Sequence, residues 1–239
     1  IFVDDVNMDF RVSDGAGTAV TPYDERTATA MSLADWRLYF AQFMEQIRAA
    51  LPDEEVVHNA IWFAGCGTTP ESCWSDPSIA RELMAADLIE LERGVNDAGI
   101  TGGFGRFGYE TFMARIDWLH SQGKGVIFDA GASTDAAREY GLASYFLVSG
   151  GRDFLGNDPA STPGDWWAGY DVALGAPVGA RYAWNGAFRR DFARGFVLVN
   201  QPGAATRTLS LGGSYLGPSG ETRTAVTLGP AAGAVLRVP

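Results

Sequence analysis

The stretch Ile1-Phe2-Val3-Asp4-Asp5 joins a short apolar run to two carboxylates, and three later stretches repeat the pattern of an apolar run that ends in an acid or an amide. These are Val56-Val57-His58-Asn59, Leu88-Ile89-Glu90-Leu91-Glu92 and Val126-Ile127-Phe128-Asp129. Segments with helical periodicity separate the runs, so the sequence predicts repeated βα units. Because the strands of such units end at one rim, we expect the polar side chains to gather there.

Helix-start signals divide the chain between these runs. Ser32 predicts an N-cap for a helix that ends before Pro52, and Asp76-Pro77 predicts the start of another that runs through Met84. The remaining predicted elements of this part are helices over residues 107–122 and 134–148 and a last short strand over residues 152–155.

The pattern changes beyond Gly156, where short alternating segments separated by turns such as Gly212-Gly213 predict a small antiparallel β-domain, which we expect to be a β-sandwich. We place the boundary near Pro177, which gives two domains, 1–176 and 177–239. Four or five parallel strands are too few to close an eight-stranded barrel. Either about three βα units precede Ile1 in a longer product, or the sheet is open and doubly wound.

The formal charge of −11 and the isoelectric point near 4.6 disfavour a nucleic-acid partner, because binding a polyanion requires clustered Lys and Arg. The longest apolar stretches, such as Ala143 to Val148, are far shorter than the roughly 20 residues that span a bilayer, so no membrane span is expected. Cys66 and Cys73 flank a short polar loop that a disulfide could close. We therefore expect a secreted protein, extracellular or periplasmic.

Two groups of glycoside hydrolases share motifs with this chain. Ile1-Phe2-Val3-Asp4-Asp5-Val6-Asn7 and Asp87-Leu88-Ile89-Glu90-Leu91-Glu92 resemble strand motifs of glycoside hydrolase family 114, the endo-α-1,4-polygalactosaminidase type. The sequence is more closely similar, over almost its entire length, to hypothetical glycosyl hydrolase family 15. The motifs that carry this second likeness are Leu91-Glu92-Arg93-Gly94-Val95-Asn96-Asp97, Trp166-Trp167-Ala168-Gly169-Tyr170-Asp171 and Val197-Leu198-Val199-Asn200-Gln201-Pro202.

The resemblance implies an α/β fold in which residues 1–176 form the C-terminal part of a (β/α)8 TIM barrel, about strands four to eight, followed by the β-domain. It also implies a nucleophile or base at Asp4 and an acid/base at Glu92. Glycosidic cleavage needs two carboxyls with opposite protonation preferences. Asp4, beside Asp5 and Asn7, is expected to stay ionised, whereas desolvation near Leu91 is expected to raise the pKa of Glu92. The sequence leaves retention or inversion open.

Polar residues at strand ends or beside these acids are candidates for binding sugar hydroxyls, and exposed Trp rings are candidates for stacking on a sugar. For the polar residues the alternative is loop capping, and for the Trp residues it is a place in the core. His58 points to the other side of its strand from Asn59 and is expected to pack in the core. The predicted substrate-binding residues are Asp5, Asn7, Asn59, Trp62, Arg93, Asn96, Asp97, Asp129, Asp153 and Trp166.

The segment Gly103-Phe104-Gly105-Arg106-Phe107-Gly108 matches the G-x-G-x-x-G pattern of dinucleotide-binding proteins and opens a predicted helix. That fingerprint follows its strand immediately, however, and about ten residues separate Glu92 from Gly103. A Rossmann-like nucleotide enzyme is therefore kept only as a further alternative.

The predicted protein is a glycosidase that cleaves a polysaccharide or oligosaccharide without a metal or another cofactor. Its expected partners are a carbohydrate substrate and an upstream segment or companion chain that completes the barrel. The first alternative is a non-catalytic carbohydrate-binding or assembly protein derived from a glycosidase barrel. A groove without paired acids would support that alternative.

Overall fold

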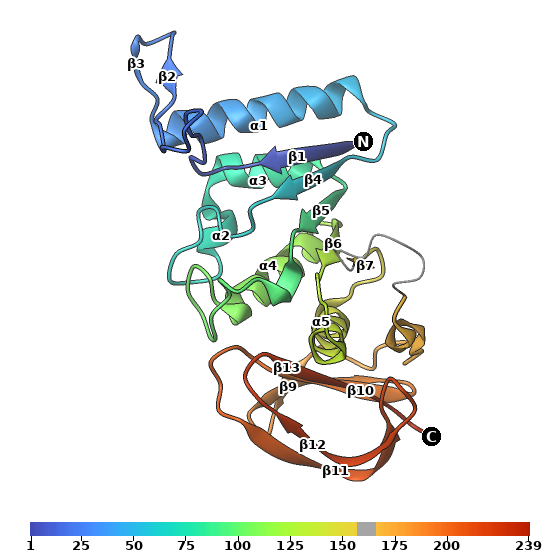
Figure 1. Cartoon of the computed structure of the whole chain (residues 1–239). Helices are drawn as coiled ribbons and strands as arrows, with labels where there is room; N and C mark the ends of the chain where they lie inside the picture. The colour runs from blue at the N-terminus through green and yellow to red at the C-terminus, as the bar shows by residue number, and fades with distance from the viewer. Residues whose placement is uncertain (157–165) are drawn as a thin grey trace.

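Five parallel strands form the first sheet of the computed structural model, which describes residues 1–156 and 166–239. Each strand pairs with the one that follows it among these five, so the spatial order repeats the chain order (Figure 1). The strands are β1 (Phe2–Val6), β4 (Val57–Ala60), β5 (Leu88–Leu91), β6 (Gly125–Asp129) and β7 (Phe154–Gly156).

Three of the helices between these strands begin where the sequence predicted, whereas the short helix Ser72–Ser75 was not predicted and the helix expected from residue 107 begins at Tyr109. Ser32 caps the first by accepting a hydrogen bond from the Asp35 amide, and Asp76 caps another in the same way from the Ser78 amide. Thr134 caps the last. The helices are α1 (Leu33–Ala50), α2 (Ser72–Ser75), α3 (Pro77–Ala85), α4 (Tyr109–Ser121) and α5 (Asp135–Val148), with 3-10 turns η1 (Gly94–Asn96) and η3 (Ala168–Asp171).

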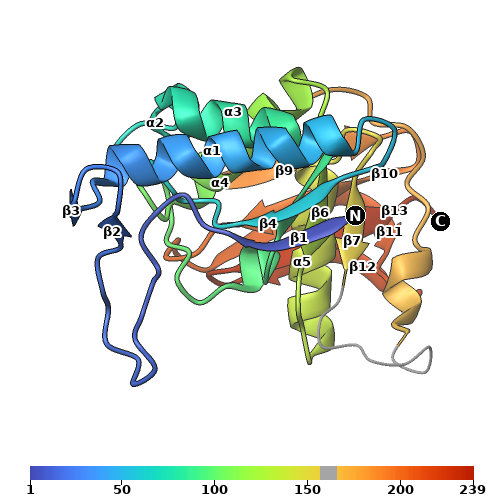
Figure 2. The same ribbon diagram turned by 90° about the horizontal axis from the view of Figure 1, so that it is seen from above.

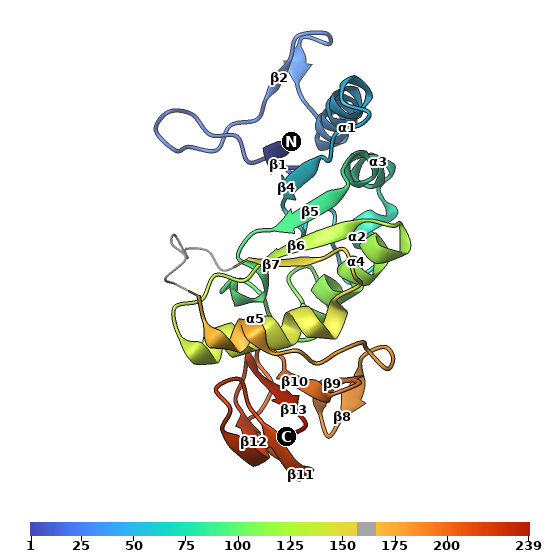
Figure 3. The ribbon, with the colours of Figure 1, turned by 90° about the vertical axis from the view of Figure 1, so that its right-hand side faces the viewer.

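Helices α1, α3 and α4 lie on the same side of the sheet (Figure 3). Right-handed crossovers between strands that follow one another in space place their helices on one face. A doubly wound sheet reverses its strand order and carries helices on both faces. The structure therefore has an open parallel sheet with α1, α3 and α4 on one face, and within the described residues the sheet ends at β1 and β7.

Alternation along the strands gives the sheet one packed face and one open face. His58, Ile89 and Val126 form one row across β4, β5 and β6, and all three are fully buried against the helices. On the other face Phe2 is 56% exposed and Phe154 is 57% exposed. Within the described residues, the face opposite the helices is open to solvent at both ends of the sheet.

The second sheet is antiparallel, with the spatial order β12-β11-β13-β10-β9-β8. It forms one continuous sheet that curls over its own core (Figure 1), whereas the sequence suggested the two separate sheets of a sandwich. The strands are β8 (Tyr182–Trp184), β9 (Ala187–Phe192), β10 (Gly195–Asn200), β11 (Arg207–Leu216), β12 (Thr222–Leu228) and β13 (Ala232–Arg237).

Helix α5 joins the two sheets. Val197, Val199 and Val235 pack into the same core as α5, while Phe196 and Leu198, which alternate with the two valines on β10, face the second core. A short hairpin, β2 (Tyr23–Asp24) with β3 (Thr29–Ala30), projects from the body in the loop after β1 (Figures 1 and 2). In residues 1–156 and 166–239, no helix has both the length and the apolar character needed to cross a bilayer.

Candidate functional site

A β-bulge at the end of β1 positions Asp4. Val3 pairs with His58 and Val6 pairs with Ala60, so two residues of β1 lie opposite the single residue Asn59 of β4. The bulge is made by Asp5, whose φ of 54° lies in the left-handed region. Its amide donates a 2.9 Å hydrogen bond to Asp4 Oδ1. The bulge thereby holds the Asp4 side chain beside the end of β4.

Asn59 connects the two predicted catalytic carboxylates. Its Nδ2 donates to Asp4 Oδ1 at 2.9 Å and lies 3.5 Å from Glu92 Oε2. The two carboxylate oxygens are therefore no farther apart than these two distances together. The structure brings the predicted acids from β1 and from the end of β5 to opposite sides of one amide.

Glu92 follows β5 and is itself followed by a left-handed residue, Arg93, with φ of 63°. Of the five non-glycine residues with positive φ in the described chain, two directly follow the candidate acids. Such conformations cost about 1 to 3 kcal/mol and concentrate at functional sites. The Glu92 side chain is 57% exposed, with Arg93 Nε 3.6 Å away, so the burial expected around Glu92 is not present in the described residues.

A small cleft of about 190 Å³ opens beside Glu92 at the carboxyl ends of β4 and β5. This volume is below the roughly 300 to 1,000 Å³ of sites for drug-sized ligands and suits one small ring. Asp4 is not one of the lining residues, but its carboxylate contacts Asn59, which lines the cleft. The lining residues are Arg11, Asn59, Ala60, Ile61, Trp62, Phe63, Glu92, Arg93 and Asp97.

Trp62 contributes to the wall of the cleft rather than to a stacking surface. It is buried, and its ring packs edge-on against Phe63 and Phe112 at centroid distances of 5.8 and 5.1 Å. The turn after β4 folds the ring back toward α4, which the strand-end position in the sequence did not reveal. Trp166 is exposed and packs against Tyr170, and its Nε1 lies 3.4 Å from Asp171 Oδ2.

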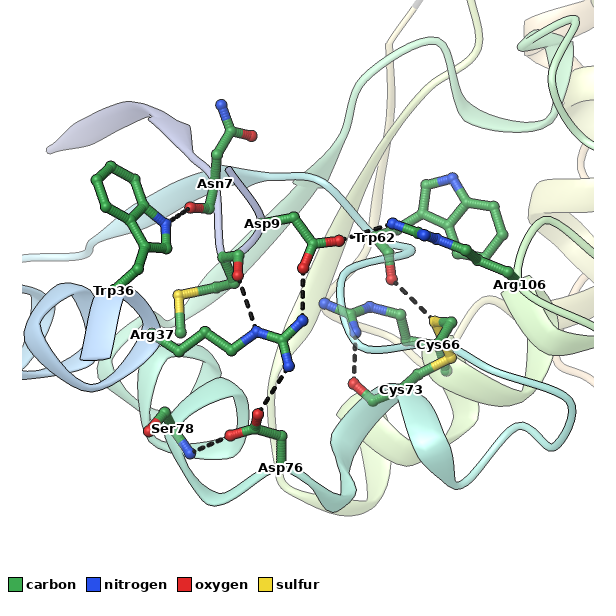
Figure 4. Close-up of polar contacts among 12 residues, drawn as sticks. Asn7, Asp9, Trp36, Arg37, Trp62, Cys66, Cys73, Asp76, Ser78 and Arg106 are labelled. Atoms are coloured by element: carbon green, nitrogen blue, oxygen red, sulfur yellow. Dashed lines mark hydrogen bonds and ion pairs between the residues drawn. A yellow bond between two sulfur atoms is a disulfide. The ribbon is translucent and has the colours of Figure 1, made fainter. Parts of the chain in front are cut away.

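A network of ion pairs braces the segments around the cleft (Figure 4). Asp9 pairs with Arg37 of α1 and, at 2.7 Å, with Arg106 of the glycine-rich loop. Arg37 also donates to the Met8 carbonyl and pairs with Asp76 at 2.9 Å. Sequence reasoning missed this network and Arg11, because these residues lie on loops and helices that meet only in the folded chain.

The predicted disulfide is confirmed: Cys66 and Cys73 are bonded, and they close the loop that continues from the Trp62 wall (Figure 4). Arg115, which is fully buried, donates from Nη1 to the Cys73 carbonyl at 3.1 Å. Burial lowers the pKa of Arg115 to about 10, although the Glu82 carboxylate acts in the opposite direction. The disulfide loop is thus fixed to α4 from the interior side.

His58 packs in the core, as predicted. Its Nδ1 lies 2.8 Å from Glu82 Oε1, and both side chains are buried. Because His58 precedes Asn59 on β4, this buried pair anchors the strand that carries the bridging amide.

Asp153 lies at the opposite edge of the sheet from the cleft, because β7 begins one residue after it. Its carboxylate accepts hydrogen bonds from His120 Nε2 at 2.9 Å and from the amides of Gly150 and Val126. Burial opposes ionisation, but these hydrogen bonds outweigh it and hold the pKa of Asp153 below its ordinary value. The predicted substrate role at Asp153 is therefore corrected to a structural one.

The other predicted residues divide between the cleft edge and loop capping. Asn96 Nδ2 donates to the Ala130 carbonyl, and Asp97 Oδ1 accepts from the Gly99 amide while also lining the cleft. Asn7 Nδ2 lies 3.4 Å from Asp5 Oδ1. Asp129 ends β6 at the same edge of the sheet as Glu92.

The glycine-rich loop uses its backbone amides within the protein. Gly103 N donates to Gln201 Oε1 at 2.7 Å, and Gly105 N donates to Thr111 Oγ1 at 3.1 Å. Gly108 N donates to the Gly105 carbonyl. A phosphate held by this loop would require these amides, so the loop serves to dock the second sheet in this structure.

Comparison with known proteins adds no assignment. No protein-family model matches the chain, and no curated protein matches its sequence. The likeness to glycoside hydrolases stays a prediction, and the function is argued below from the residues of the cleft.

Proposed function

We propose that this protein is a glycoside hydrolase that retains anomeric configuration, with Asp4 as nucleophile and Glu92 as acid/base. The observation that carries the proposal is the contact of Asn59 with both carboxylates. It limits the separation of the nearest carboxylate oxygens to less than the roughly 6.5 to 9.5 Å of inverting enzymes, and the roughly 5 to 5.5 Å of retaining enzymes fits within it.

The way each carboxylate is held supports the proposed roles. Asp4 Oδ1 accepts hydrogen bonds from the Asp5 amide and Asn59, which suits a carboxylate that stays ionised and leaves Oδ2 to attack the anomeric carbon. Glu92 is held more loosely and extends from a strand end into the cleft. Glu92 gives its proton to the leaving oxygen, and then takes a proton from the water that cleaves the glycosyl–Asp4 ester.

We also propose that the parallel sheet is part of a closed barrel. On the open face, the row beginning at Phe2 is apolar across β4 and β5, and the next row carries the polar groups of Asp4, Asn59 and Glu90. A closed barrel buries the first row and leaves the second at its mouth. We propose that further parallel βα strands pair with β1 and cover Phe2, which would also bury Glu92 as the acid role requires.

A non-catalytic sugar-binding protein is the second candidate, because the cleft is open and Glu92 is largely exposed. Both candidate functions use the same cleft, but only the hydrolase requires the paired carboxylates. The disulfide supports an oxidising compartment, as in secreted proteins.

The test is release of reducing ends from a panel of polysaccharides by the wild type and by Glu92→Gln. We expect Glu92→Gln to lose at least about 100-fold in kcat, as loss of general acid catalysis does. Glu55→Gln is the matched control, because Glu55 is 58% exposed at the other edge of the sheet and should keep full activity. Sugar binding with no hydrolysis by the wild type would favour the second candidate.

A further inference from the structure

Asn59 sits between two like charges, and its neighbours on both sides are acids. Strand β4 lies between β1 and β5, so a side chain at its carboxyl end faces Asp4 on one side and Glu92 on the other. We infer that Asn59 is a positioning residue, whose amide fixes the spacing of the two carboxylates and offsets their mutual repulsion. This inference rests on the proposed function for its meaning in catalysis.

The chemistry of a carboxamide suits this place. Its NH2 group offers two donors and carries no charge, so one nitrogen serves both acceptors. An aspartate at position 59 would add a third negative charge to the group, and an alanine would leave the carboxylates facing each other with no donor between them. Because both neighbours are acceptors, the amide nitrogen rather than the oxygen must face them.

The backbone that carries Asn59 is held from both sides. Val57 pairs with Phe2 of β1 and with Leu88 of β5, and the preceding His58 is locked by its buried contact with Glu82. The amide is therefore presented from a fixed strand toward two side chains that extend from strand ends. A donor fixed between two acceptors helps to set the positions of both.

Other charged groups face the same space and set the background for the titration of the pair. Asp5 lies next to Asp4 on β1, Glu90 of β5 is the register partner of Asn59, and Arg93 follows Glu92. Arg11 and Asp97 line the cleft. Since none of these is removed by a substitution at position 59, a change in the titration of the two acids can be assigned to the amide.

The direct test is a pH titration of the side-chain carboxyl carbons of Asp4 and Glu92 by 13C NMR. Asn59→Ala should raise the higher apparent pKa of the pair by about one pH unit, because the second negative charge is then formed beside the first without a donor. Asn59→Asp should disturb the titration further, and Asn59→Gln, which restores an amide, should return it toward the wild type. Gln122→Ala, which removes an exposed side-chain amide bonded to Ser121 Oγ at the end of α4, is the control and should leave the titration unchanged.

Kinetics give the second readout. Asn59→Ala should lower kcat about 10- to 100-fold with little change in KM, and shift the alkaline limb of the pH profile upward with the NMR titration. Unchanged titration in a folded Asn59→Ala protein would overturn the inference. If the titration shifts as expected while the wild type hydrolyses no saccharide, the positioning of the pair stands and the proposed hydrolase function fails.

Discussion

The two edges of the parallel sheet use carboxylates in opposite ways. At the amino edge, Asp153 is 1% exposed and receives three hydrogen bonds from His120 and two backbone amides. At the carboxyl edge, Asp4 and Glu92 are exposed and share one amide with each other. A carboxylate that stabilises the fold is surrounded by donors, whereas each acid of the proposed catalytic pair has fewer donors and lies near another acid.

The largest effect should come from removing the proposed nucleophile, Asp4. Asp4→Ala should abolish hydrolysis, with a loss of at least about 1,000-fold in kcat, and azide added to the assay should restore part of it by replacing the missing carboxylate. The unfolding free energy should change by no more than about 0.5 kcal/mol, because Asp4 is exposed. Loss of activity without rescue, together with a lower melting temperature, would mean that Asp4 has a structural role like Asp153.

Breaking the disulfide should have the next largest effect. Replacing both Cys66 and Cys73 by Ser opens a loop with a sequence separation of 7, which should lower the unfolding free energy by about 2 to 3 kcal/mol. Because this loop continues the wall that Trp62 forms, we expect KM to rise more than kcat falls. The checks are denaturant unfolding and steady-state kinetics. An unchanged KM would show that the disulfide loop does not support the wall of the cleft.

At the amino edge, Asp153→Asn should reduce stability and spare activity. The unfolding free energy of the variant should fall by about 1 to 3 kcal/mol, because the half-buried His120 and the two amide donors lose a charged acceptor. The pKa of Asp153 is lowered in the folded state, so its contribution to stability is present above the ordinary value near 3.8 and is lost as pH falls through the lower folded value. Urea unfolding across pH 2 to 6 checks this, and kcat measured below the melting temperature should match the wild type.

The smallest effect is expected from substitutions that relieve backbone strain. Arg93→Gly and Asn185→Gly both place glycine at a left-handed position, so each should gain up to about 1 kcal/mol in unfolding free energy. Only Arg93 adjoins the cleft, and only Arg93→Gly should lower kcat. Equal activity in the two variants would show that the strain after Glu92 has no part in positioning it.

Much of the first sheet could be predicted from local patterns. The apolar runs give β1, β4, β5 and β6, and their terminal acids gather at one edge because parallel strands share a direction. The convergence of Asp4, Asn59 and Glu92 could be predicted from the sequence, because each residue lies at the end of an apolar run that forms a strand. The caps at Ser32 and Asp76 follow from residues three or fewer positions apart.

The features that the sequence did not reveal depend on distant contacts or on register. Asp153 was placed within a strand predicted over residues 152–155. Because β7 begins at Phe154, two residues later, Asp153 lies before the strand, at the opposite edge of the sheet from the cleft. The bulge at Asp5 was missed because a positive φ is uncommon for any non-glycine residue and the register shift against β4 has no local sequence pattern. Arg37 and Asp9 are 28 residues apart, so no local pattern joins them.

The most direct test of the paired carboxyl edge is 1H NMR of the first sugar product released from a cleaved polysaccharide. Two carboxylates held across Asn59 predict that the product appears with the anomeric configuration of the substrate, before mutarotation, and that Glu92→Gln releases none. A product of inverted configuration would contradict the short separation of the carboxylates. Full activity in Glu92→Gln would contradict the pair itself.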